Sequence, residues 1–193
     1  LADLLGRVPV PPDAAAGARF ARREIAVVAL LIEAAQIDRA SSADERDAVL
    51  RIVRERFGLD VPPERIVVTA GASAALQLAC LALVEHGDEV LMPDPSYPCN
   101  RHFVAACEGV PVLLPAPAGQ RFQLSGAAVE AAWTPRTRGV LLASPSNPTG
   151  TSIAPDEMGR IVGAVRARGG FTLVDEIYLA LSFDDTYGHS ALL

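Results

Sequence analysis

From about Glu64 to the end of the chain, short apolar runs rich in β-branched residues alternate with longer stretches of helical spacing. This alternation is typical of a mainly parallel sheet covered by helices, because parallel neighbouring strands need a long crossover connection. The expected strands are 66–68, 89–92, 110–114, 139–143 and 171–174. The expected helices between them are 73–85, 97–107, 125–132 and 155–168. The sequence therefore predicts a three-layer α/β fold with a mainly parallel central sheet.

The first sixty residues are less regular. Helical spacing is present over 22–36 and 43–57, whereas 1–18 carries Pro9, Pro11, Pro12 and Gly17 and is expected to be a loop or a weakly ordered arm. We therefore divide the chain into an N-terminal arm with helices, residues 1–58, and an α/β domain, residues 59–193.

Composition excludes several classes of function. The chain has 193 residues, a formal net charge of −6 and scattered arginines, which argues against a nucleic-acid partner and favours small-molecule chemistry. Its longest apolar stretch, 25–35, is too short to span a membrane, and no signal-peptide pattern opens the chain, so a cytoplasmic location is expected. The three cysteines and three histidines lack metal-site spacing, and no metal is predicted.

Small residues follow the first expected strand and lead directly into a helix. Gly71, Ala72 and Ser73 would bring free backbone amides, the positive end of the helix dipole and a hydroxyl together, which suits a phosphate group. The alternative is that Ser73 serves only as the N-cap of the helix.

Four further candidates follow other strands, where ligands bind in an open parallel sheet. Asn147 lies between two prolines that hold its amide; Asp175 ends an apolar strand and could keep a heteroaromatic nitrogen protonated. Tyr178 could hydrogen-bond a ligand oxygen, and Tyr97 could stack on a flat ring from the loop that 93–95 is expected to force. The alternatives are a plain turn, an Asp satisfied by a helix N-terminus and two packing tyrosines.

With these residues in place, segment 59–190 resembles the class I/II aminotransferase family, the fold-type-I enzymes that use pyridoxal 5'-phosphate (PLP). The resemblance implies that the position of Gly71, Ala72 and Ser73 binds the cofactor phosphate and that Tyr97 stacks on the pyridine ring. It also implies that Asn147 and Tyr178 hydrogen-bond the phenolic oxygen of the ring, and that Asp175 pairs with its nitrogen.

The implied activity moves an amino group from an amino acid to a 2-oxo acid, in a homodimer. In the resembled family a lysine holds PLP as a Schiff base and then shuttles the substrate proton. All 17 Lys+Arg positions of this chain are arginine. No catalytic residue is therefore assigned, and the chain is expected to be an incomplete large domain that holds the cofactor but is inactive in isolation.

Three other functions share parts of this pattern. A PLP lyase or synthase of the same fold would share the cofactor-holding residues, and a lysine-less ligand-binding derivative would need no catalytic lysine. A nucleotide hydrolase with 171–176 as its acidic strand is excluded, because no glycine-rich loop ending in Lys-Ser or Lys-Thr precedes it.

Overall fold

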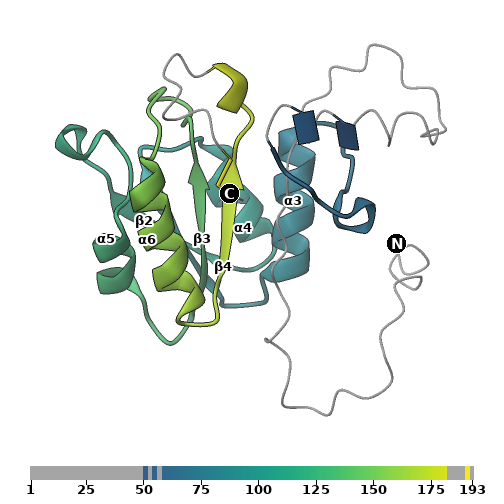
Figure 1. The fold of residues 1–193 in the computed structure, drawn as a ribbon. Helices are drawn as coiled ribbons and strands as arrows, with labels where there is room; N and C mark the ends of the chain where they lie inside the picture. Colours follow the sequence, from purple (N-terminus) through teal and green to yellow (C-terminus); the bar gives the residue numbers. More distant parts are fainter. Residues whose placement is uncertain (1–49, 52–53, 56–57, 182–189, 192–193) are drawn as a thin grey trace.

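A computed structural model of the protein describes residues 50–51, 54–55, 58–181 and 190–191 (Figure 1). The arm expected at 1–18, the helix expected at 22–36 and most of the one at 43–57 lie outside the described residues. Within the last of these, residues 50–51 and 54–55 are helical. The boundary between residues 58 and 59 stays a prediction.

Four parallel strands form one sheet in the order β2-β1-β3-β4. Their bounds are β1 Glu89–Asp94, β2 Val110–Pro115, β3 Thr137–Ala143 and β4 Phe171–Asp175. β3 and β4 stay in register from Gly139 opposite Phe171 to Ala143 opposite Asp175. A Cβ atom on residue 139 would lie 2.3 Å from the Phe171 ring, so this close pairing requires the glycine.

Helices cover both faces of the sheet, as the three-layer prediction required. The helices are α3 Ala72–Leu83, α4 Cys99–Ala106, α5 Gly126–Ala132 and α6 Pro155–Arg166, with short 3-10 turns at Pro63–Arg65, Ala118–Gln120 and Leu179–Leu181. Val90, Met92, Leu141 and Leu173 face α3 and α4, and Leu91, Val140 and Leu142 face α5 and α6. Figure 1 shows α6 in front of the sheet and α4 behind it. The alternation follows from the two-residue period of a strand.

The strand expected at 66–68 is wrong. These residues form no strand, and the side chains of Val67 and Val68 are 59% and 64% exposed. A β-strand needs a hydrogen-bonded neighbour, and none of the four described strands pairs with this segment. Residues 66–68 thus have the β-branched composition of a strand, but they form none because no described strand pairs with them.

The loop expected at 93–95 begins later than predicted, because β1 continues through Pro93 to Asp94. The carbonyl oxygen of Asp94 accepts a hydrogen bond from the Ala116 amide, on the β2 side. The backbone groups of successive strand residues point to opposite sides, so those of Pro93 point toward β3. Pairing of β1 with β3 stops at Leu91. Pro93 has no N–H to donate toward β3, which agrees with the end of this pairing before it.

Three helices are also shorter than expected. The helix expected at 97–107 begins only at Cys99, after Pro98, and ends at Ala106. The one expected at 73–85 ends at Leu83, because Val84 is extended and buried, and the one expected at 155–168 ends at Arg166.

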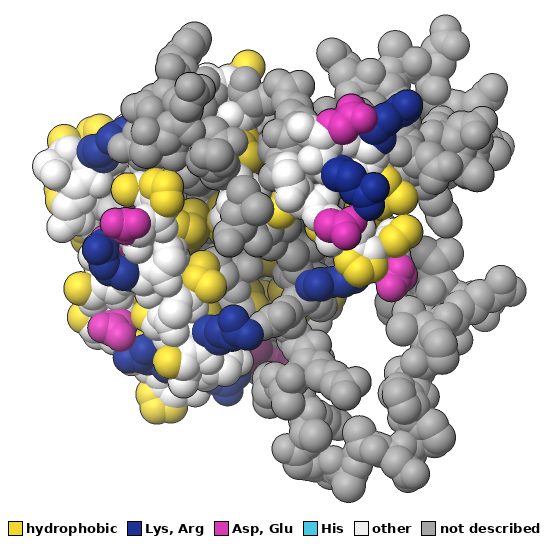
Figure 2. Space-filling model, in the orientation of Figure 1, with side chains coloured by type: hydrophobic (Ala, Val, Ile, Leu, Met, Phe, Trp, Pro, Cys, Tyr) yellow, Lys and Arg dark blue, Asp and Glu magenta, His cyan; other side chains and the backbone are white. Residues whose placement is uncertain are grey.

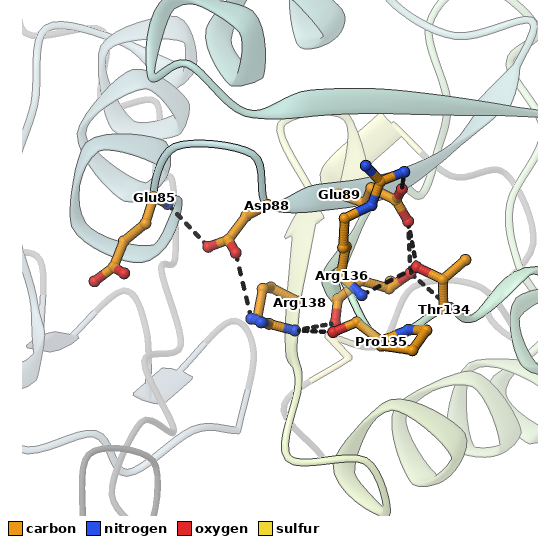
Figure 3. A network of polar contacts seen from close by, with 8 residues as sticks. Glu85, Asp88, Glu89, Thr134, Pro135, Arg136 and Arg138 are labelled. Atoms are coloured by element: carbon orange, nitrogen blue, oxygen red, sulfur yellow. Dashed lines mark hydrogen bonds and ion pairs between the residues drawn. The ribbon is translucent and has the colours of Figure 1, made fainter.

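A polar network joins the amino ends of β1 and β3 (Figure 3). Glu89 is buried at the start of β1, where one carboxylate oxygen accepts a hydrogen bond from the Thr134 hydroxyl at 2.5 Å and the other binds Arg136 at 2.5 Å. The bond from Thr134, with help from Arg136, outweighs burial and lowers the pKa of Glu89. Beside it, Asp88 pairs with Arg138 at 3.3 Å. This end of the sheet is thus fixed by charge and hydrogen bonds.

Candidate functional site

The seven candidate residues lie at the carboxyl end of the sheet or in the first turn of α3. Tyr97 follows β1, Asn147 lies in the loop after β3, and Asp175 ends β4 with Tyr178 in the turn beyond it. Ser144, which begins the Asn147 loop, donates its backbone N–H to the carbonyl of Asp175 at 3.0 Å. The topology therefore gathers residues that are up to about a hundred positions apart at one edge.

The first turn of α3 lacks a side-chain cap among the described residues. Its N-cap is Gly71, with φ +92°. A positive φ of this size suits glycine and strains other residues. Ser73 is the second helical residue and is exposed, so it does not act as the N-cap. Free amides, the helix dipole and the Ser73 hydroxyl therefore occur together, which is the arrangement that a phosphate requires.

Asp175 is a buried carboxylate at the end of β4, 9% exposed. Burial raises its pKa, and a hydrogen bond from the Ile177 backbone amide to Oδ1, at 3.1 Å, lowers it in part. Among the described residues this partner is a turn amide and not the helix N-terminus of the alternative interpretation. Desolvation disfavours the charged form, so this carboxylate gains from a cation beside it. A protonated ring nitrogen meets that requirement.

Tyr97 is half-buried in the segment between β1 and α4. The neighbouring Cys99 side chain raises the pKa of the Tyr97 phenol, and the Ser73 side chain lowers it in part. Tyr178 lies near enough for its charge to raise that pKa further. Ser73 and Tyr178 therefore lie near enough to Tyr97 to affect its ionisation, and their shared role in a site stays a prediction.

Asn147 is half-buried, and no side-chain hydrogen bond joins it to the other candidates within the described residues. Its place comes from the loop backbone, where Ser146 donates to the Thr151 carbonyl at 2.9 Å and Gly150 donates to the Ser146 carbonyl at 2.7 Å. The Ser144 hydroxyl also accepts from the Ile153 amide at 3.0 Å. The loop is thus held closed while the amide of Asn147 stays available.

Two supporting residues were missed by sequence reasoning. Gln123 is buried and donates from Nε2 to the carbonyls of Ala143, at 3.2 Å, and Thr151, at 2.7 Å, which ties the end of β3 to the Asn147 loop. Glu176 accepts from the Ala191 amide at 2.6 Å and from the Ser190 hydroxyl at 2.7 Å. Gln123 lies in no motif, whereas Glu176 could have been found by its place next to Asp175.

Figure 2 shows arginine and acidic side chains interspersed on the visible face, without a patch of one sign. Within the described residues, no group of three or more His, Cys, Asp or Glu side chains could hold a metal ion, and no helix is long and apolar enough to cross a membrane. A surface hollow beside residues 50–63, lined by Arg54, Glu55 and Asp60 among others, shares no lining residue with the candidate site.

Comparison with known proteins gives concordant results. The family model for aminotransferase class I and II matches residues 36–192. A valine–pyruvate aminotransferase of Mycobacterium tuberculosis is 38% identical over 138 residues, which are 72% of this chain and 35% of the relative.

Solved structures agree with the sequence comparison. The aspartate aminotransferase from Rhizobium meliloti superimposes with a TM-score of 0.71 at 33% identity, covering 76% of this chain and 37% of that one. The N-succinyldiaminopimelate aminotransferase from Mycobacterium tuberculosis gives 0.70 at 36% identity, covering 76% and 38%. The chain therefore spans little more than a third of the length of the relatives that it matches.

Proposed function

The chain belongs to the class I and II aminotransferase family, and from that premise we propose that it supplies the PLP-holding residues of an aminotransferase. The substrates would be an amino acid and a 2-oxo acid. For the assembled enzyme we propose a homodimer acting in the cytoplasm, as the resemblance implies. The observation that carries the proposal is Asp175, a carboxylate desolvated at a strand end where the fold places ligands.

The phosphate end of PLP would bind at the first turn of α3. The uncapped amides after Gly71 would donate to phosphate oxygens, and the Ser73 hydroxyl would add a further donor. Ala72 has a small, buried side chain, which lets the anion approach the backbone.

The ring end of PLP would lie between Tyr97 and Asp175. The carboxylate of Asp175 would hold the proton on the ring nitrogen, Tyr97 would stack on the ring, and Asn147 and Tyr178 would hydrogen-bond its phenolic oxygen. When bound, PLP supplies an electron-withdrawing ring that stabilises negative charge at the α-carbon of the substrate. Asp175 makes that withdrawal strong, because it keeps the nitrogen in its charged form.

The chain holds no lysine side chain, so its residues would hold PLP without a covalent bond. The proton shuttle that the family assigns to lysine is likewise not among them, and we assign no catalytic residue in this chain. Its share of the chemistry is binding, orientation of the ring and retention of one proton at the ring nitrogen.

A titration of the full 193-residue chain with PLP, followed by absorbance and fluorescence, tests the proposal. We expect saturable binding that inorganic phosphate competes away and that dialysis reverses. Borohydride reduction followed by peptide mass spectrometry should find no modified side-chain amine. Absence of saturable binding, or a reduced adduct on a side chain, would contradict the proposal. Asp156→Asn, an exposed acidic position in the first turn of α6, is the matched control for Asp175→Asn.

A further inference from the structure

Gln123 is a buried residue whose amide nitrogen faces the loop that carries Asn147, residues 144–151. Nε2 donates to the Ala143 carbonyl at 3.2 Å and to the Thr151 carbonyl at 2.7 Å. Both acceptors are carbonyl oxygens, and only the nitrogen of the amide carries hydrogens, so the orientation of this side chain is fixed. Gln123 is 5% exposed. Its two donors therefore join the last residue of β3 to the far end of the loop.

The Thr151 carbonyl is shared between Gln123 and the loop itself. It also accepts from the backbone amide of Ser146 at 2.9 Å, and the Ser146 carbonyl accepts from the Gly150 amide at 2.7 Å. Asn147 lies inside the turn that these two bonds close. A shift of Thr151 away from β3 would therefore move the backbone from which the Asn147 side chain extends.

The backbone just before Gln123 has an unusual conformation. Arg121 and Phe122 both adopt left-handed backbone angles, with φ 55° and 56°, although neither is glycine. Bulky residues rarely adopt this region, because the Cβ atom crowds the backbone. The turn is held by the Phe122 amide, which donates to the Pro117 carbonyl at 3.2 Å, and by the Gln123 amide, which donates to the Gln120 carbonyl at 3.1 Å. The chain thus accepts local strain immediately before the residue that reaches the loop, and such strain is concentrated at functional sites.

The segment that carries Gln123 is attached at both ends to elements that flank the candidate site. At its start, the Ala116 amide donates to the carbonyl of Asp94, the last residue of β1, at 2.9 Å. At its end, the Gly126 amide donates to Oε1 of Glu157, in the first turn of α6, at 2.7 Å. Gln123 is therefore fixed relative to the sheet, and it can hold the loop in place.

The oxygen of the Gln123 amide does not contribute to stability. Oε1 is buried and has no hydrogen-bond partner within the described part of the chain. An unpaired buried acceptor is unfavourable, because it has lost its hydrogen bonds to water. A methionine of similar length would avoid this cost but would supply no donor to the loop. The two donors are therefore the property of glutamine that matters at this position.

We propose that Gln123 is a positioning residue for PLP: by holding Thr151 against the end of β3, it sets the place of the Asn147 amide at the phenolic oxygen of the ring. Gln123 acts through the loop and makes no contact with the cofactor. The role rests on the proposed function, because that function makes Asn147 a contact of PLP. Holding of the loop needs no cofactor and can be measured separately.

The first test uses the wild-type chain without cofactor. Exchange of side-chain amide hydrogens with solvent, followed by nuclear magnetic resonance, compares Gln123 with Gln120, which is exposed in the same segment. Burial and two hydrogen bonds should slow the exchange at Gln123 at least about tenfold. Equal rates would overturn the proposal, and this result does not depend on whether any variant folds.

The second test follows the backbone amides of Ser146 and Gly150 in Gln123→Met, which keeps the length of the side chain and removes both donors. Both amides should exchange about 5- to 100-fold faster, because the loop opens more often. Amides in the middle of β3 serve as the reference, and Gln120→Met is the matched control. Unchanged exchange in the loop, or one common acceleration of loop and strand amides, would overturn the proposal.

The third test measures PLP binding in a double-mutant cycle. Gln123→Met should raise the Kd about three- to tenfold. In an Asn147→Ala background the same change should have little further effect, because the residue through which Gln123 acts is gone. In a Ser73→Ala background it should keep its full effect. A full effect in the Asn147→Ala background would indicate a general packing role and overturn the proposal.

The absorbance spectrum of bound PLP adds a readout that packing alone would not change. Asn147→Ala should shift the spectrum, because the phenolic oxygen loses a donor, and Gln123→Met should shift it in the same direction. Ser73→Ala acts at the phosphate and should not shift it. A wild-type spectrum in Gln123→Met would overturn the positioning role. If the wild-type chain does not bind PLP, the proposed function fails and the role at PLP fails with it, while the exchange experiments still decide whether Gln123 holds the loop.

Discussion

Asp175 Oδ1 accepts a hydrogen bond from the backbone amide of Ile177 at 3.1 Å. The contact folds the chain back directly after β4 and fixes the carboxyl plane at the strand end. Burial still raises the pKa of Asp175, because one amide does not replace the water lost by the charged group. The amide thus orients the carboxylate of Asp175 but does not compensate its negative charge. A carboxylate in this state is stabilised by a bound cation.

Replacing Asp175 by Asn should separate stability from binding. In the cofactor-free chain the ionised carboxylate has a desolvation cost that the amide avoids, so the free energy of unfolding at pH 7 should not fall. PLP affinity should fall about 10- to 100-fold, because a charge-assisted hydrogen bond to the ring nitrogen is lost. Thermal unfolding and a PLP titration measure the two quantities. Unchanged affinity would remove Asp175 from the site.

PLP binding should depend on pH through the same group. The folded pKa of Asp175 is raised, so the carboxylate becomes protonated, and stops pairing with the ring nitrogen, at a higher pH than the value of about 3.9 for an ordinary Asp. We therefore expect affinity to decline on acidification from neutral pH, before general unfolding begins. Far-ultraviolet circular dichroism at each pH provides the control. An affinity that follows the unfolding curve would contradict this origin.

Gly71 and Gly159 offer a matched pair of alanine substitutions. Gly71→Ala places a side chain at φ +92°, which should cost about 1–3 kcal/mol in the free energy of unfolding and weaken PLP binding at the adjacent amides. Gly159 lies in α6, where an added Cβ atom would meet no other atom within 4 Å. Gly159→Ala should therefore stabilise by about 0.5–1 kcal/mol. Denaturant unfolding of both variants measures the contrast, and equal effects would refute it.

Two serines at helix starts should behave differently. Ser125 caps α5, accepting from the Ala128 amide at 3.1 Å, so Ser125→Ala should lose about 1 kcal/mol of stability and retain PLP affinity. Ser73 does not cap α3, so Ser73→Ala should keep its stability and lose PLP affinity about three- to tenfold. A loss of stability in Ser73→Ala, with unaltered affinity, would assign Ser73 a structural role.

The Glu89 network should stabilise the chain in a pH-dependent way. The folded pKa of Glu89 is lowered, so its contribution is present above the unfolded value of about 4.3 and disappears as pH falls through the lower folded value. Thr134→Val removes the bond that lowers this pKa most and should cost about 1–3 kcal/mol at pH 7. The cost should shrink as the pH falls below the unfolded value. Thr172→Val, at a partly exposed position of β4, is the control, and a cost that is independent of pH would contradict the mechanism.

Much of the sheet could be predicted from the sequence, because its information is local. The apolar runs around Val90, Val140 and Leu173 mark strands by composition alone, and parallel topology then gathers their carboxyl ends at one edge. The positions of Tyr97 and Asp175 at that edge follow from the same rule, whereas the strand expected before Ser73 does not form. The role given to each residue in the site hypothesis came from the chemistry of its side chain, such as a carboxylate for a ring nitrogen or a hydroxyl for a phosphate.

Other features depend on contacts that are distant in sequence. Glu89 meets Thr134 across 45 positions, and Gln123 reaches Ala143 across 20, so no local pattern marks either residue. Val67 and Val68 show the opposite case, in which a local strand pattern is present but no described strand pairs with it. A strand forms only when another strand pairs with it, and the sequence of one segment does not show whether such a partner is present.

The polar network at Glu89 and the carboxyl-end residues occupy opposite ends of the same strands. β3 has seven residues, which at about 3.3 Å each separates the two ends by about 20 Å. Substitutions this far apart usually have additive effects on the free energy of unfolding. An engineer could therefore adjust the robustness of the scaffold from one end while screening ligand preference at the other, with little need to search the two sets of positions jointly.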